Sequence, residues 1–485
     1  MSDAPAIDRE ALRQLAHAAV DLAVDHLSGV RDGAVFTPMT ADERRALLEQ
    51  RLPDEGRTPR AILDLVRDAV LPHQMGNGHP RFFGWVNSPP APLGAVADLL
   101  AAAMNPSCAG GDHAAIYVER AAVRWLMELV GFPVDGSMGL LVSGASVASI
   151  VALAAARHRA AVAQDWDIRA DGLQGARPRL RLYVSGEGHS CMFKAAELLG
   201  LGASAIRTVP VDERFAIDPR ALREAIEADR RAGDVPFFVA ASAGTVGTGA
   251  IDPLDALADI CAEEHLWLHI DGAYGALGVL AKSRAARYAG MARADSLALD
   301  PHKWLSVPAE CGCVLVRDGA LLRDTFSLVP PYLRTEEGKG FGGLPWFSEY
   351  GVQQTRGFRA LKLWMVLQHL GGRGVTALVE RHLALAERLA SLVDTAPDLE
   401  RLAPVELSIV CFRYVPPALR GDAARLDALN KRIMERVQAD GAAFVTNTTI
   451  GGRFALRACI LHYATTEQDV TALVDVIRRT GAALG

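Results

Sequence analysis

The stretch SLALDPHKWL, residues 296–305, places Lys303 directly behind an apolar run that has the pattern of a β-strand. The other lysines lie on polar helical faces or in glycine-rich segments: Lys194, Lys282, Lys339, Lys362 and Lys431. A lysine in an apolar setting is costly unless it is paired or deprotonated, and the neutral amine is a nucleophile. The alternative is a turn lysine whose stem is covered while its ammonium reaches water.

The chain on either side of this stretch alternates between short apolar runs and helical segments. The clearest runs that we expect to be strands are 180–185, 206–211, 237–241, 266–270, 296–299 and 313–316. Strands separated by helices predict an α/β fold, with a mostly parallel central sheet flanked by helices. Ligands of such sheets bind at the carboxyl ends of the strands, so the residues at those ends are the candidates for function.

Three structural units are expected from the pattern along the chain. Residues 1–85 predict an N-terminal helical segment, with helices at 7–30, 40–50 and 59–71. Residues 86–370 predict the large α/β domain. Residues 371–485 predict a small C-terminal α+β domain, with a long helix to about 393, helices at 426–438 and 466–479, and strands at 408–414, 443–446 and 454–461.

The composition excludes several classes of protein. A net charge of −6 and an ordinary charged fraction of 22% provide no basic surface for nucleic acid. Seven dispersed cysteines and an acidic N-terminal sequence without an apolar core predict a reduced, cytoplasmic protein. The uncharged stretch at 139–156 is nearly long enough to cross a membrane, but its Ser, Ala and Gly residues favour a strand, a turn and a helix. We therefore expect no membrane association.

Two further motifs follow predicted strands. VSGAS, residues 142–146, combines small residues with hydroxyls at a strand–helix turn, where backbone amides and the helix dipole can bind an anion. An ordinary tight turn has the same composition. His189 in SGEGHS is either a surface histidine or an imidazole stacked on a flat ring.

The next two motifs are a glycine- and threonine-rich loop and a carboxylate at the end of a predicted strand. ASAGTVGTGAIDP, residues 241–253, is a glycine-rich turn that would let the backbone approach a ligand around Thr245. Asp271 ends the strand-like WLHID, where a carboxylate needs a cationic partner or a metal. His265 and His269 lie close by in sequence, but they lack the wider ligand set of a metal site, so we expect no metal.

An anion-binding turn, a ring-stacking histidine, a carboxylate and a lysine at successive strand ends suit one cofactor. Pyridoxal 5′-phosphate has a phosphate, an aromatic ring, a pyridine nitrogen and an aldehyde that condenses with lysine. Paired with Asp271, its pyridine nitrogen would stay protonated, and Lys303 would hold the aldehyde.

With these residues, the sequence resembles the group II pyridoxal-dependent amino acid decarboxylases, a family that includes the aromatic L-amino acid decarboxylases. The strings that carry the resemblance are HPRFF at 79–83, SGAS at 143–146, HS at 189–190, AGT at 243–245, WLHIDGAYG at 267–275, DPHKW at 300–304, PPYLR at 330–334 and FRALKLW at 358–364. The resemblance implies an aspartate-aminotransferase-like fold and a homodimer whose N-terminal helices embrace the partner subunit.

The resemblance also implies a role for each matching residue. Lys303 would bind the cofactor covalently, and Asp271 would pair with the pyridine nitrogen. His189 and Ala273 would lie on the two faces of the ring. Tyr332, in a mobile loop that reaches about residue 343, would protonate the carbon that loses its carboxylate. The remaining cofactor contacts would come from Ala145, Ser146, Thr245, Asp300 and His302.

The chain departs from the family pattern at three positions. Asp300 stands where aromatic decarboxylases usually carry Asn, Val246 where many members have Thr, and Gly357, expected near the substrate pocket, where a second Arg is common. Phe82, Phe83 and Trp85 are candidates for an apolar substrate pocket, although such residues also form cores. We expect decarboxylation of an L-amino acid, in the first place an aromatic one, to its amine and carbon dioxide.

Other readings stay open. On the same fold, the enzyme could be a decarboxylase of acidic or diamino substrates, a carbon–carbon lyase or an aminotransferase. An inactive relative that only binds other proteins is also compatible with the fold, but the intact Lys303, Asp271, His189 and Tyr332 argue against it.

Overall fold

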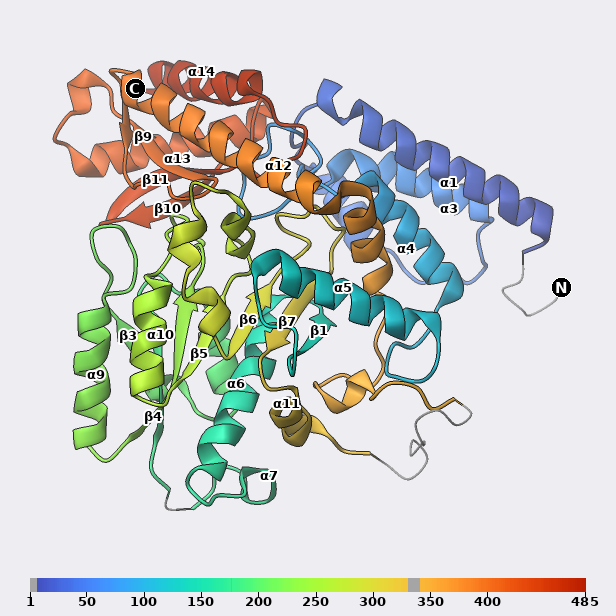
Figure 1. Ribbon diagram of the computed structural model, residues 1–485. Helices are drawn as coiled ribbons and strands as arrows, with labels where there is room; N and C mark the ends of the chain where they lie inside the picture. Colours follow the sequence, from blue (N-terminus) through green and yellow to red (C-terminus); the bar gives the residue numbers. More distant parts are fainter. Residues whose placement is uncertain (1–6, 176, 330–340) are drawn as a thin grey trace.

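A seven-stranded sheet forms the centre of the molecule (Figure 1). The computed structural model describes residues 7–175, 177–329 and 341–485. The strand order is β1-β7-β6-β5-β4-β2-β3, and β7 alone among the seven runs against its neighbours β1 and β6. The strands span Met138–Val142 (β1), Leu180–Ser185 (β2), Ile206–Val209 (β3), Val235–Ser242 (β4), Trp267–Asp271 (β5), Ser296–Leu299 (β6) and Gly312–Val316 (β7). The predicted mostly parallel α/β sheet is confirmed.

Helices cover both faces of this sheet, as parallel strands require (Figure 1). One face packs on α6 (Ala145–Val162), α8 (Cys191–Leu198) and α11 (Gly319–Phe326). The other packs on α5 (Ala114–Val130), α9 (Pro219–Arg231) and α10 (Leu254–Glu263). A four-residue helix, α7 (Ile168–Asp171), follows α6. Every strand residue of β1 and β2 is buried, which explains the unbroken apolar sequence of β1. β2 includes the buried Arg181, which is paired with Asp234.

The C-terminal unit is a four-stranded antiparallel sheet of order β10-β11-β9-β8 with helices on one side. Its elements are β8 (Leu399–Arg401), β9 (Ile409–Tyr414), α13 (Ala423–Asp440), β10 (Thr446–Ile450), β11 (Arg453–Cys459) and α14 (Glu467–Leu484). β10 begins where the strand predicted at 443–446 ends, so that prediction was misplaced. The predicted long helix is α12 (Ala360–Thr395), which begins earlier and kinks at Gly371, whose φ of 61° lies in the left-handed region that glycine tolerates.

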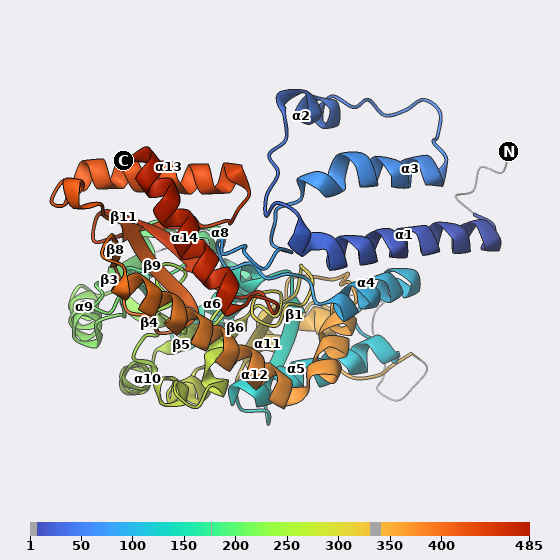
Figure 2. The ribbon, with the colours of Figure 1, turned by 90° about the horizontal axis from the view of Figure 1, so that it is seen from above.

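The N-terminal residues form α1 (Arg9–Gly29), α2 (Ala41–Leu48) and α3 (Pro59–Leu65), followed by α4 (Pro92–Met104). Figure 2 shows α1, α2 and α3 standing to one side of the body. Between α3 and α4, the chain crosses to the C-terminal unit, where the Phe83 amide donates to the Phe444 carbonyl at 2.7 Å. In the described ranges, no helix has the length and apolar character that a membrane span needs.

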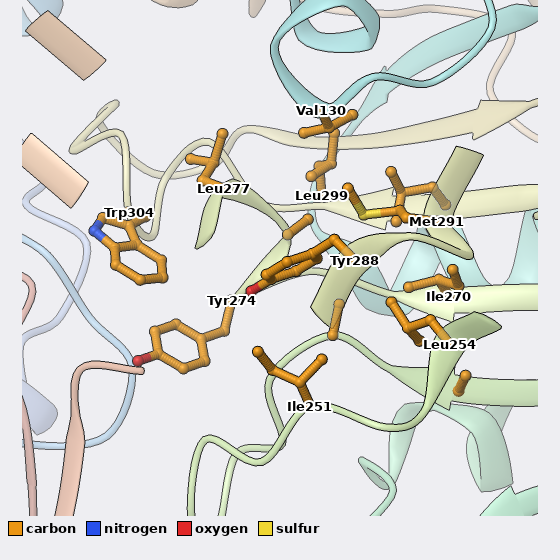
Figure 3. Packing of buried hydrophobic residues seen from close by; sticks show 14 of the residues in the cluster. Val130, Ile251, Leu254, Ile270, Tyr274, Leu277, Tyr288, Met291, Leu299 and Trp304 are labelled. Carbon is orange, nitrogen blue, oxygen red and sulfur yellow. The ribbon is translucent and has the colours of Figure 1, made fainter. Parts of the chain in front are cut away.

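The core beneath the strand ends is built from aromatic and aliphatic side chains (Figure 3). Tyr274 and Trp304 stack with ring centroids 5.2 Å apart and planes 11° from parallel. The Tyr274 hydroxyl lies 2.6 Å from Ser408 Oγ and accepts from the Ser408 amide at 2.8 Å. This contact ties the loop after β5 to the C-terminal unit, so it fixes the residues that follow Asp271.

Candidate active site

A cavity of about 340 Å³ opens at the carboxyl ends of β1, β2, β4, β5 and β6. Most of the predicted site residues line it, although they come from separate parts of the chain. The lining consists of Val86, Ser143, Gly144, Ala145, Ser146, His189, Ser242, Gly244, Thr245, Val246, Asp271, Ala273, Tyr274, Asp300, His302 and Lys303. The strand-end rule therefore brings the predicted residues together.

Lys303 is not in the apolar setting that its local sequence predicts. Its Nζ lies 3.1 Å from Asp300 Oδ2, and its side chain is 23% exposed. The two residues share one tight turn, in which the Lys303 amide donates to the Asp300 carbonyl at 2.8 Å. The prediction failed because it followed the apolar residues 296–299 and did not consider that Asp300, the acid directly after them, could pair with Lys303. Lys362 is more deeply buried, and it is paired with Asp98 at 3.3 Å.

The turn at VSGAS is the N-terminus of α6. Gly144 precedes the helix and provides no side-chain cap. The Ala145 amide instead donates to Asp300 Oδ1 at 2.8 Å, so a carboxylate from a distant loop caps the helix. Ser143 and Ser146 line the cavity beside it. The hydroxyls and the helix N-terminus suit an anionic group such as a phosphate.

Asp271 lies at the end of β5, where both of its side-chain oxygens have neighbours. The Ala273 amide donates to Oδ1 at 3.1 Å, and the Cys191 thiol lies 4.0 Å from Oδ2. Burial, reinforced by the charge of Asp271, raises the pKa of Cys191 to about 12, so this thiol is uncharged at neutral pH. Cys191 is a site neighbour that the sequence did not single out.

Two histidines on or before β5 do not join Asp271 in a metal site. His269 is fully buried, and its Nδ1 lies 2.8 Å from Ser296 Oγ, while His265 is exposed before the strand. Among the described residues, the potential metal ligands that converge are His189, Cys191 and Asp271, whose ligand atoms lie within 4.8 Å of one another. Desolvation lowers the pKa of His269 to about 4, so its imidazole is neutral.

His189 and Ala273 both line the cavity. His189 Nδ1 accepts from the Cys191 amide at 3.2 Å, which fixes the orientation of the ring through its own backbone turn. His302 is the second imidazole of the cavity. Its Nδ1 accepts from the Cys311 amide at 3.0 Å, and burial lowers the pKa of its ring below the ordinary value.

The threonine loop is held by its own side chains and by an arginine. Thr245 Oγ1 accepts from the Ala250 amide at 3.1 Å. Arg457, on β11, donates to the carbonyls of Val246 and Trp85, each at 2.8 Å. The sequence analysis missed Arg457, although an arginine in the otherwise apolar run FALRACIL is a recognisable signal.

The three aromatic residues predicted for the substrate pocket lie in different environments. Phe82 stacks on Phe444 at 4.9 Å, and Phe83 is fully buried in the core of the C-terminal unit. The pocket prediction is therefore wrong for both, because their segment pairs with the C-terminal unit. Trp85 is 49% exposed, and its neighbour Val86 lines the cavity instead.

Two further predicted features lie elsewhere. Arg356, expected near the substrate pocket together with Gly357, is buried and paired with Glu119, and it also donates to the Cys108 carbonyl at 2.8 Å. Neither Arg356 nor Gly357 belongs to the cavity lining. Tyr332 lies outside the described residues.

The donor set fits pyridoxal 5′-phosphate. Two carboxylates, a lysine amine and two imidazoles share the cavity with a helix N-terminus flanked by serine hydroxyls. These are the groups that a pyridine nitrogen, an aldehyde, an aromatic ring and a phosphate would need.

Comparisons with known proteins agree with this chemistry. The family model described as "Pyridoxal-dependent decarboxylase conserved domain" matches residues 41–415. An aromatic-L-amino-acid decarboxylase of Bacillus atrophaeus is 33% identical, over 99% of this chain and 97% of the relative. A human acidic amino acid decarboxylase is 31% identical, over 91% of this chain and 85% of the relative. The crystal structure of Oryza sativa TDC with PLP and tryptamine superposes with a TM-score of 0.91 at 28% identity, and the match covers 100% of both chains.

Proposed function

This chain belongs to the pyridoxal-dependent decarboxylase family, and we propose that its substrate is an aromatic L-amino acid. The protein is a pyridoxal-phosphate-dependent carboxy-lyase, which releases carbon dioxide from an amino acid and leaves the amine. The full-length similarity to an aromatic-amino-acid decarboxylase carries the choice of substrate. The predicted family resemblance, fold and cofactor are confirmed.

In this proposal, the cavity residues divide the work of binding and proton control. Pyridoxal phosphate, when bound, supplies an electron-accepting ring for the bond to the departing carboxylate. Lys303 would hold the aldehyde carbon, and Asp271 would keep a proton on the pyridine nitrogen. His189 and Ala273 would contact the faces of the ring. Further contacts would come from Ala145, Ser146, Thr245, Asp300 and His302.

The last proton transfer would belong to Tyr332. The cavity wall offers His189 and His302 as further proton-carrying groups, and burial favours the neutral imidazole of His302. We assign the proton donor to Tyr332 on the family resemblance. A phenol with an ordinary pKa near 10 is protonated at neutral pH and can donate to a carbanion.

We also propose that two copies of the chain form a homodimer. Every residue of α1 remains at least partly exposed, including the apolar side chains of Leu12, Val20 and Val24. On the body, α4 exposes Val96, Leu99, Leu100 and Met104 beside an apolar cavity of about 570 Å³. Figure 2 shows α1 and α4 on the same side of the molecule. Apolar faces of this extent favour burial against a partner.

This arrangement suits the embrace expected from the N-terminal helices. Sedimentation of the purified protein tests it, and Leu100→Glu should convert the dimer to monomer. A monomeric wild-type protein at micromolar concentration would contradict the proposal. The cytoplasm remains the proposed compartment, supported by seven buried cysteines that are all free thiols.

A second substrate class has one observation in its favour. The human relative that matches most of this chain is named an acidic amino acid decarboxylase. Carbon dioxide release from a panel of L-amino acids separates the two classes. We expect an aromatic amino acid to have the highest kcat/KM. A preference for aspartate, glutamate or a diamino acid would overturn the aromatic assignment and leave the family assignment intact.

A further inference from the structure

Asp300 joins two parts of the cavity that are far apart in sequence. Its Oδ1 accepts from the Ala145 amide at 2.8 Å, and its Oδ2 lies 3.1 Å from Lys303 Nζ. His302 Nε2 lies 3.6 Å from the same Oδ2. The Asp300 side chain is 4% exposed, so these neighbours, and not water, determine its environment.

A carboxylate is the side chain that satisfies both of these partners. The amide of Ala145 and the ammonium of Lys303 are both donors, so each needs an acceptor oxygen. An asparagine could accept from Ala145, but its NH₂ group would then face the donors of Lys303. The acid at position 300 therefore changes the contacts and the charge of the site relative to an amide.

The charge lies where the cofactor needs a positive environment. The first amide of α6 and the dipole of the helix are already partly neutralised by Asp300. Lys303 pairs with the Asp300 carboxylate, so less of the positive charge of Lys303 is left to attract a bound anion. A phosphate beside Ser143 and Ser146 would bind at a helix N-terminus that already carries the negative charge of Asp300.

We propose that Asp300 is a positioning residue that pairs with Lys303 and weakens the retention of the cofactor through its phosphate. This inference rests on the proposed function, because it assumes that the cavity takes pyridoxal phosphate. It assigns Asp300 contacts with Ala145 and Lys303, whereas the family resemblance implies a direct contact with the cofactor. The enzyme would then exchange its cofactor more readily than a variant with an amide at this position.

The experiment measures cofactor affinity in Asp300→Asn. Removal of one negative charge next to the phosphate-binding turn should lower the dissociation constant for pyridoxal phosphate at least about fivefold, because like charges at short range repel. Inorganic phosphate should compete with the cofactor more strongly in the variant, by a similar factor. Pyridoxal, which lacks the phosphate, reports any change that acts through Lys303 alone. Its dissociation constant should therefore fall clearly less than that of pyridoxal phosphate.

Asp98→Asn is the matched control. Asp98 pairs with Lys362 at 3.3 Å, outside the cavity, so its amide should leave cofactor affinity unchanged. Asp300→Ser is a second neutral variant in case Asp300→Asn folds poorly, because it removes the charge and keeps a small polar side chain at this position. It should also bind pyridoxal phosphate more tightly than the wild type.

The outcomes separate this inference from the function on which it rests. If wild-type protein binds the cofactor but Asp300→Asn and Asp300→Ser bind it equally or more weakly, the inference is wrong and the function stands. A gain for pyridoxal as large as for pyridoxal phosphate would also overturn it, because the effect would then not involve the phosphate. If the wild-type protein binds no pyridoxal phosphate, the proposed function and the inference both fail.

Discussion

The indole N–H of Trp304 donates to Nδ1 of His382 at 3.0 Å. Nδ1 therefore carries no proton, and Nε2, which lies 3.2 Å from the His462 carbonyl, is the donor of the ring. Burial lowers the pKa of His382 to about 3. Because Trp304 follows Lys303 directly, this neutral histidine anchors the lysine loop to α12.

The stability of the protein should consequently depend on the charge of His382 in mild acid. The folded-state pKa of His382, about 3, lies below the unfolded value of about 6.5. The contribution of the neutral imidazole to the free energy of unfolding is therefore complete above pH 6.5 and is lost as the pH falls toward 3. By pH 5, the loss should be about 2 kcal/mol. Urea unfolding at pH 7, 6 and 5 measures it.

His382→Gln is the control for this pH dependence. A glutamine can accept from Trp304 through its oxygen and donate to the His462 carbonyl through its nitrogen, but it does not titrate. As the pH falls, the free energy of unfolding of the wild type should therefore decrease more than that of the variant. Parallel pH profiles for the two proteins would show that His382 does not carry the effect.

Replacing Lys303 with Ala should remove covalent capture of the cofactor and reduce amine formation at least about a hundredfold. Visible absorbance reports the capture, and carbon dioxide release reports turnover. Lys194→Ala, at an exposed position of α8, should retain both signals. Full activity in the Lys303 variant would refute the assignment of this lysine.

Tyr332→Phe should lower amine formation about a hundredfold or more while the cofactor stays bound, because the role proposed for this phenol is to donate a proton and not to bind the cofactor. The product mixture and the visible absorbance should be recorded together. Loss of the cofactor from this variant would mean that Tyr332 acts in binding instead.

Glu119→Gln should destabilise the fold by about 3–5 kcal/mol, because it leaves the charge of Arg356 without its buried partner. Both side chains are almost completely excluded from solvent. Denaturant unfolding measures the loss, and Arg124→Gln, which breaks the exposed pair of Arg124 with Glu128, should cost less than about 1 kcal/mol. Equal effects of the two substitutions would contradict the role of burial.

The sequence predicted those features that depend on local pattern and on the geometry of parallel sheets. The strand predicted at 180–185 is β2, and Asp271 ends β5 as expected. The strand ends also brought His189, Asp271 and Lys303 to one cavity. These successes follow from periodicity and from the rule that parallel strands present their carboxyl ends together.

The remaining features depend on contacts that the local apolar pattern does not reveal. Nothing next to Phe83 indicates that it pairs with Phe444, so its place in the C-terminal core could not be read from its own segment. Likewise, Asp300 neutralises Lys303 because a turn folds the acid back on the amine, and the apolar residues before it suggested a different environment. The antiparallel direction of β7 has no signature in its apolar sequence.

The crossing of residues 81–83 into the C-terminal unit has a consequence for biosynthesis. The Phe83 carbonyl accepts from the Cys459 amide at 3.0 Å, so an aromatic segment is covered by strands that are translated much later than the segment itself. Until then, Phe83 lacks the side chains of the C-terminal unit that surround it in the native core. The N-terminal segment can therefore complete its native packing only after these later strands have been made.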